Sequence, residues 1–234
     1  MFTQLLWKEW RENLWKLSFC LTVSLAFTML LFRVRLFTDM ANCLILSMVL
    51  TFAVPVIYAL DLFAGEMSNR TIHLLFKIPV PRWQIFFSKM VVTFIGFGLT
   101  FVITGLIMEI MAHGRETTVG MLMGVHLWFA LCATLLFVWF AVFGCQNRSE
   151  ATSLVTLAGV LIGWGIVFFW STICEVGWAT HCVPYAFAYA GQIAVTRVEF
   201  AWLNVPLLLL VQSLSLAIAL ALACYRYGKI RRYL

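Results

Sequence analysis

Six apolar runs dominate this sequence and constrain its fold more than any other feature. They cover residues 14–32, 43–63, 90–111, 121–143, 152–173 and 205–225. A helix needs about 20 predominantly apolar residues to cross the hydrocarbon core of a bilayer, and each run is close to that length. We therefore expect an all-α membrane protein in which residues 1–234 form a single domain of six transmembrane helices.

The composition excludes the common soluble classes. Hydrophobic residues make up 63% of the chain and charged residues 11%, whereas soluble domains carry roughly 25% charged residues. The six spans nearly use up the 234 residues, and no GxxxxGK[ST] phosphate-binding loop occurs, so we expect any energy from ATP to come from another chain. No CxxC or HExxH pattern is present, and we expect neither a metal site nor a catalytic residue.

The basic residues predict the orientation of the chain. With both termini in the cytoplasm, twelve of the sixteen Lys and Arg residues fall in cytoplasmic segments. The opposite orientation would leave only four of them there. Because cytoplasmic loops carry an excess of Lys and Arg, both termini are predicted to be cytoplasmic. The net charge of +6 is thus assigned to membrane orientation rather than to nucleic-acid binding.

Residues 64–89 form the longest predicted cytoplasmic loop. Within it, residues 71–77 have Ile72, Leu75 and Phe76 at helical spacing, which indicates a short amphipathic helix. Pro79 and Pro81 then end that helix, because proline cannot donate a backbone hydrogen bond and restricts the residue before it. The loop is also basic, with Arg70, Lys77, Arg82 and Lys89. It is either a docking surface for a cytosolic partner or an ordinary positive-inside loop.

A longer pattern within this loop favours the first interpretation. It consists of Gly65-Glu66, Thr71, Leu74-Leu75, Pro79-Val80-Pro81-Arg82 and Lys89. This pattern resembles the cytoplasmic loop of type-2 ABC transporter (ABC-2) permeases. The chain departs from it at Arg70, where the family usually has Gly, and at Pro81, where Ser is common.

The resemblance implies a function and a set of partners. In that family the loop contains a coupling helix that sits on a separate cytosolic ATPase, so the resemblance implies a permease subunit of an ABC transporter, interpreted here as an exporter in the bacterial cytoplasmic membrane. Two ATPase copies would bind ATP and Mg²⁺, and a second permease copy, identical or related, would complete the route through the lipid bilayer. This chain would bind no cofactor itself. The implied coupling residues are Glu66, Thr71, Leu74, Leu75, Phe76, Pro79 and Arg82.

The resemblance also implies a translocation route. In the family, the second and fifth helices approach it, which makes Pro55, Gly159 and Gly163 the candidates here. Pro55 should kink its helix. The four-residue spacing of Gly159 and Gly163 permits close contact between helices, either with a second copy or within one subunit.

Four further features lie outside the six apolar runs or near their ends. Residues 1–13 predict an interfacial helix whose tryptophans suit the headgroup region. Residues 174–203 resemble the short exoplasmic helices before the last span of that family. Cys174 and Cys182 share this segment and could form a disulfide. Asp61 and Glu109 are ionisable but close to predicted helix ends, where water or a cation can satisfy them.

Two other classes of function remain open at this stage. An intramembrane enzyme acting on a lipid or peptide would require polar catalytic groups that converge at one membrane face. A secondary transporter would require inverted repeats and ionisable residues near the bilayer midplane. Neither pattern is evident in the sequence.

Overall fold

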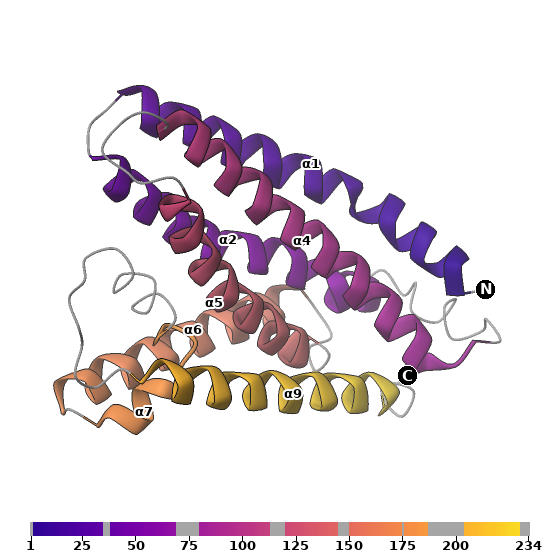
Figure 1. Ribbon diagram of the computed structural model, residues 1–234. Coiled ribbons are helices and arrows are strands. Elements are labelled where there is room, and N and C mark those ends of the chain that lie inside the picture. The colour runs from indigo at the N-terminus through magenta and orange to yellow at the C-terminus, as the bar shows by residue number, and fades with distance from the viewer. Residues whose placement is uncertain are drawn as a thin grey trace.

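All regular structure in the described part of the chain is helical. The computed structural model describes residues 2–34, 38–68, 80–112, 120–144, 150–174, 176–186 and 204–229 (Figure 1). The helices are α1 (Phe2–Val34), α2 (Asp39–Ser68), α4 (Arg82–Ala112), α5 (Met121–Gly144), α6 (Glu150–Ile173), the short α7 (Gly177–His181) and α9 (Val205–Lys229). Six of them are long and apolar enough to cross a membrane, which confirms the predicted all-α fold and its six spans.

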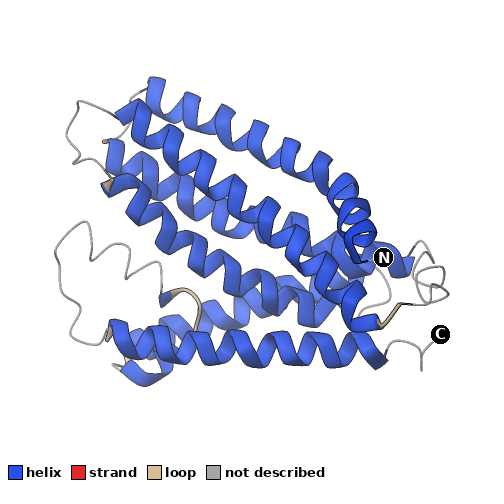
Figure 2. Ribbon diagram, turned by 45° about the vertical axis from the view of Figure 1, so that its right-hand side comes forward, coloured by secondary structure: helices blue, strands red, loops and turns tan. Residues whose placement is uncertain are grey.

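The long helices pack around α5. Helix α1 runs along α4, and α2 runs along α5, which also contacts α4 and α9 (Figures 1 and 2). Helix α6 packs on α2 and α5 from the opposite side to the α1–α4 pair. In the most apolar window of α5, 61% of the residues are buried, against 11% in α6. Helix α5 is therefore the centre of the bundle, and α6 is its most exposed span.

One end of the bundle gathers the elements that the sequence predicts to be cytoplasmic. The start of α1, the end of α9, and the ends of α2 and α4 that flank residues 69–81 all lie at this end (Figures 1 and 2). We call it the terminal end. The starts of α2 and α5 lie at the other end, as an odd number of crossings requires.

Three helix boundaries differ from the prediction. Residues 2–13, predicted as an interfacial helix leading into the membrane, are continuous with the first span in α1, and no Gly or Pro occurs between Phe2 and Val34 to interrupt it. Helix α2 passes through Pro55 and extends to Ser68. Helix α4 already begins at Arg82, directly after Pro81, whose carbonyl accepts a hydrogen bond from Gln84 N at 2.9 Å. The segment between α2 and α4 is therefore residues 69–81, shorter than the predicted loop.

Four threonines inside the spans are satisfied by their own helix. The hydroxyls of Thr28, Thr51, Thr100 and Thr104 each donate to a backbone carbonyl four residues earlier, at 2.7–2.9 Å. This arrangement needs no water, so it is compatible with a hydrocarbon environment.

Glu109 has a clear structural role. Its carboxylate accepts hydrogen bonds from the backbone nitrogens of Gly120 at 2.6 Å and Met123 at 3.2 Å. Gly120 has a φ of +84°, a left-handed conformation that favours glycine. Glu109 on α4 therefore caps the start of α5, where the first backbone N–H groups have no partner within the helix.

Candidate functional site

The structure describes two of the seven predicted coupling residues, and both belong to helix ends at the terminal end. Arg82 is the first residue of α4 and is half-buried. Glu66 belongs to the last turns of α2. The remaining five, Thr71, Leu74, Leu75, Phe76 and Pro79, lie outside the described residues.

The start of α4 presents two different faces. On one side, Trp83 and Phe87 are exposed, and their ring centroids are 6.2 Å apart in an edge-to-face arrangement. On the other side, Phe86 is buried and packs against Tyr227 of α9, with the ring centroids 5.7 Å apart. The first two turns of α4 are thus fixed to α9, while the aromatic pair of Trp83 and Phe87 stays accessible at the start of the helix.

A buried ion pair joins this region to α1. Lys89 Nζ lies 3.0 Å from both carboxylate oxygens of Glu9. The two side chains are only 3% and 2% exposed. Lys8, which is 40% exposed, adds a contact of 3.4 Å to Glu9, and Asn13 donates to the Glu9 carbonyl at 2.8 Å. Lys89, taken from the sequence as one part of a motif, therefore bonds to the N-terminal part of α1.

A second buried polar contact lies within the spans. Ser47 Oγ on α2 and His126 Nδ1 on α5 are 2.7 Å apart. The imidazole also lies against the ring of Phe101, at 5.1 Å between centroids. No group of three or more His, Cys, Asp or Glu side chains in the described part of the chain could hold a metal ion. We interpret the Ser47–His126 contact as a link between α2 and α5.

Gly105 keeps this region closely packed, which gives a testable prediction. A Cβ atom at Gly105 would overlap Met123 Sδ and lie 3.1 Å from His126 Cδ2. Gly105→Leu should therefore destabilise the protein by about 1–3 kcal/mol, the usual effect of overpacking a core. Thermal denaturation in detergent measures the effect. Gly98→Leu is the matched control, because a Cβ there meets nothing within 4 Å; equal melting temperatures for the two variants would contradict the prediction.

The glycines proposed for the translocation route lie on an open surface. Gly159 and Gly163 on α6 are exposed, and a Cβ atom at either would meet nothing within 4 Å. They do not form a contact within the described part of the subunit. Pro55, by contrast, is buried in α2. The structure therefore does not bring Pro55 together with the two glycines on one surface.

Trp139 of α5 lies between α6 and α9. Its Nε1 donates to Ser215 Oγ on α9 at 3.1 Å. Its ring meets Trp164 of α6 edge to face, with 6.1 Å between centroids. All three side chains are half-buried. Trp139 thus connects the two outer helices.

The segment after α6 folds back onto the bundle. His181 Nε2 accepts a hydrogen bond from Asn204 N at 3.0 Å, and its carbonyl accepts one from Gln212 Nε2 at 2.6 Å. Tyr185 donates to the carbonyl of Leu161 at 3.1 Å. Burial raises the pKa of the Tyr185 hydroxyl to about 12, so it stays protonated at neutral pH. Residues 176–186 are therefore anchored to α6 and α9.

Cys174 and Cys182 are both exposed and do not form a disulfide with each other in the structure. The disulfide that their shared segment allowed is therefore not observed, and the hydrogen bonds of His181 and Tyr185 hold this segment instead.

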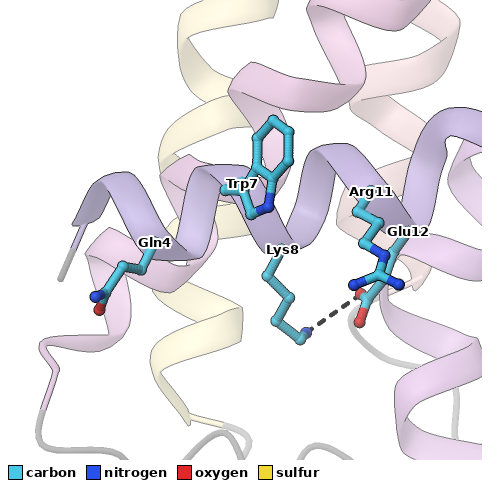
Figure 3. A pocket seen from close by; sticks show the side chains of 5 residues that line it. All are labelled: Gln4, Trp7, Lys8, Arg11 and Glu12. Atoms are coloured by element: carbon cyan, nitrogen blue, oxygen red, sulfur yellow. Dashed lines mark hydrogen bonds and ion pairs between the residues drawn. The ribbon is translucent and has the colours of Figure 1, made fainter.

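Hollows on the described surface include one at the start of α1 and one between α4 and α5. One, of about 500 Å³, lies at the start of α1 and is lined by Gln4, Trp7, Lys8, Arg11 and Glu12 (Figure 3). Lys8 Nζ lies 3.2 Å from Glu12 within it, so its charge is already largely balanced. The other, of about 600 Å³, is an apolar groove between α4 and α5. Neither brings together groups suited to catalysis.

Comparison with known families agrees with this architecture. Residues 6–162 match the family described as ABC-2 family transporter protein. The matched region runs from the first turns of α1 into α6, about two-thirds of the chain. The chain belongs to the ABC-2 transporter family. No curated protein matches it.

Family membership confirms the resemblance found in the loop. An ABC-2 membrane subunit is a permease that works with an ABC ATPase, so this chain is an integral membrane permease of an ABC transporter. ABC-2 permeases are typically transport subunits that do not catalyse a reaction themselves. The two alternatives, an intramembrane enzyme and a secondary transporter, have no comparable support.

Proposed function

We propose that this chain is the permease subunit of an ABC exporter, which pairs with a second permease copy and binds two copies of a cytosolic ATPase. The observation that carries the proposal is the family match over residues 6–162, which includes the whole 69–81 segment. ATP and Mg²⁺ would bind to the ATPase, and this chain would convert the closure of the ATPase into a movement of its spans.

The proposed orientation places the terminal end in the cytoplasm. Twelve of the sixteen basic residues belong to the segments that the sequence predicts to be cytoplasmic, in agreement with the positive-inside rule. The exposed Trp7 and Trp15 at the start of α1 suit the lipid headgroup region on the same side. A cytosolic ATPase could then reach residues 69–81 directly.

The ATPase would bind the segment between α2 and α4. Leu75 and Phe76 are proposed as the apolar anchors in a groove of the ATPase, and Thr71 and Leu74 belong to the same short helix. Glu66 and Arg82 would fix its two ends by charge-assisted hydrogen bonds. Pro79 would keep the following turn rigid. The described start of α4 supports this role, because Phe86 packs on Tyr227 and gives the segment a firm base.

The second permease copy would pack along α6. This helix has the smallest buried share of the six spans, and Gly159 and Gly163 leave its surface open for a close approach. We assign the translocation route to the region between the two α6 helices of such a pair. Pro55 is buried in α2 and would affect the route only through the shape of that helix.

Purification of the tagged chain from its native membrane in a mild detergent tests the proposal. An ABC ATPase should co-purify, and the complex should hydrolyse ATP in a vanadate-sensitive manner. Deletion of residues 71–77 should release the ATPase. Binding of a cytosolic ATPase to the intact chain would also require the terminal end to face the cytosol. A chain that is folded and active in its membrane but copurifies with no nucleotide-binding subunit would contradict the proposal.

A further inference from the structure

Helices α1 and α4 run in the same direction and are held at a fixed register. Each buries small or polar side chains at intervals of three or four residues, which places them along one side of the helix. They are Glu9, Asn13, Lys16, Cys20, Ser24 and Thr28 on α1, and Lys89, Thr93, Gly96, Thr100 and Thr104 on α4.

Two direct contacts define the register. Lys89 bonds to Glu9 at 3.0 Å, and the hydroxyl oxygens of Thr104 and Ser24 lie 3.0 Å apart. Both contacts join residues that are 80 positions apart. Because this sequence separation is the same for both contacts, the two helices keep the same alignment from one contact to the other. The contacts are about 22 Å apart along the helices, at 1.5 Å per residue.

The ion pair is poorly explained as a source of stability alone. Removing two charges from water is costly, and a well-packed apolar pair is often as stable as a buried ion pair or more so. An ion pair differs from an apolar pair in how well it tolerates a shift of one helix along the other. Apolar side chains can slide past one another, whereas a shift of α1 along α4 would separate two charges that are 3% and 2% exposed. The pair therefore fixes the position of α1 on α4.

The pair also lies where movement would enter the membrane. Lys89 is seven residues, or two turns, after the start of α4 at Arg82. Glu9 lies in the first turns of α1, which continues without Gly or Pro to Val34. A displacement of the start of α4 would therefore reach α1 directly across this contact.

We propose that Glu9 and Lys89 are positioning residues that make α1 and α4 move as one body when the ATPase displaces residues 69–81. This inference rests on the proposed function and extends it. The loop would act on a pair of helices rather than on α4 alone. The pair would take part in coupling without touching either the ATPase or the cargo.

Labelling of single cysteines in the purified permease–ATPase complex tests this. Trp7→Cys on α1 and Trp83→Cys on α4 replace exposed side chains, 69% and 54% exposed respectively, in a chain whose native cysteines are replaced by serine. The rate of maleimide modification is measured without nucleotide and after trapping with ATP and vanadate. In the chain with Glu9 and Lys89 intact, trapping should change the rate at both positions.

The decisive variant is Glu9→Leu/Lys89→Met, which removes both charges of the pair and leaves Lys8 its contact with Glu12. Trapping should still change the labelling of Trp83→Cys, but the change at Trp7→Cys should be lost. Lys89→Arg retains the ion pair and should retain both changes. If the apolar variant gives too little folded complex, Glu9→Gln/Lys89→Gln removes both charges while keeping hydrogen-bonding groups.

Two results would overturn the inference. One is a nucleotide-dependent change at Trp7→Cys that persists in either uncharged pair. The other is no change at Trp7→Cys in the chain with the ion pair intact, although Trp83→Cys responds. Failure of the proposed function is recognised separately, because no complex with an ATPase would then be isolated.

Discussion

Replacing Leu75 and Phe76 together with aspartate is expected to abolish ATP-driven transport while leaving the six spans folded. These two side chains are the apolar members of the short amphipathic segment at residues 71–77. Burying a side chain of this size contributes about 1.5–3 kcal/mol, and every 1.4 kcal/mol is a factor of ten in affinity. Losing both anchors should therefore weaken binding of the ATPase by about a hundredfold or more.

The measurements are co-purification of the ATPase and ATP hydrolysis by the complex in reconstituted membranes. Thr117→Asp/Thr118→Asp is the matched control, because it adds the same two charges to the segment between α4 and α5, at the other end of the bundle. The control should retain the ATPase. A Leu75→Asp/Phe76→Asp chain that binds the ATPase normally and transports at the unmodified rate would show that residues 71–77 are not the coupling element.

The spans could be predicted because they depend on a local property of the sequence. A bilayer requires about 20 apolar residues in a row, and no tertiary contact is needed to recognise such a run. The boundaries at the terminal end were harder to predict. Charged residues such as Lys8, Arg11 and Lys89 resemble loop residues by composition, yet no helix-breaking residue separates them from the adjacent spans. The helices therefore extend beyond the apolar runs.

The contacts between helices could not be predicted from the sequence. Glu9 interrupts the apolar side of residues 2–13 and appears unfavourable until Lys89, 80 residues later, is placed beside it. Ser47 and His126 are 79 residues apart, and Trp139 and Ser215 are 76 apart. Such pairs depend on which helices are neighbours, and a hydropathy pattern does not contain that information. The matching spacing of polar residues on α1 and α4 was the one available signal.

The glycines illustrate the same limit. Gly105 and Gly163 are both glycines within apolar runs, yet a Cβ atom at Gly105 would overlap Met123 while one at Gly163 would meet nothing within 4 Å. One is required by packing within the subunit, and the other lies on the outside of α6. Only the three-dimensional structure distinguishes the two roles.

Gly163→Leu is accordingly expected to leave the subunit folded but to impair its pairing with a second copy. The new side chain has space within the subunit, so the melting temperature in detergent should not fall. If two α6 helices approach closely at Gly159 and Gly163, the leucine should hold them apart. We expect the dissociation constant of the pair to rise by about tenfold or more, which corresponds to about 1.4 kcal/mol.

Native mass spectrometry of the protein in mild detergent measures the share of paired subunits. Gly165→Leu is the matched control, because it makes the same change on the same helix without a close neighbour within the subunit. At 3.6 residues per turn, Gly165 lies about 200° around the helix from Gly163, so the control should pair normally. Equal pairing and transport in the two variants would assign the Gly159–Gly163 surface to lipid. A loss of pairing in Gly163→Leu alone would instead place the second copy against it, because the two leucines leave α6 in nearly opposite directions.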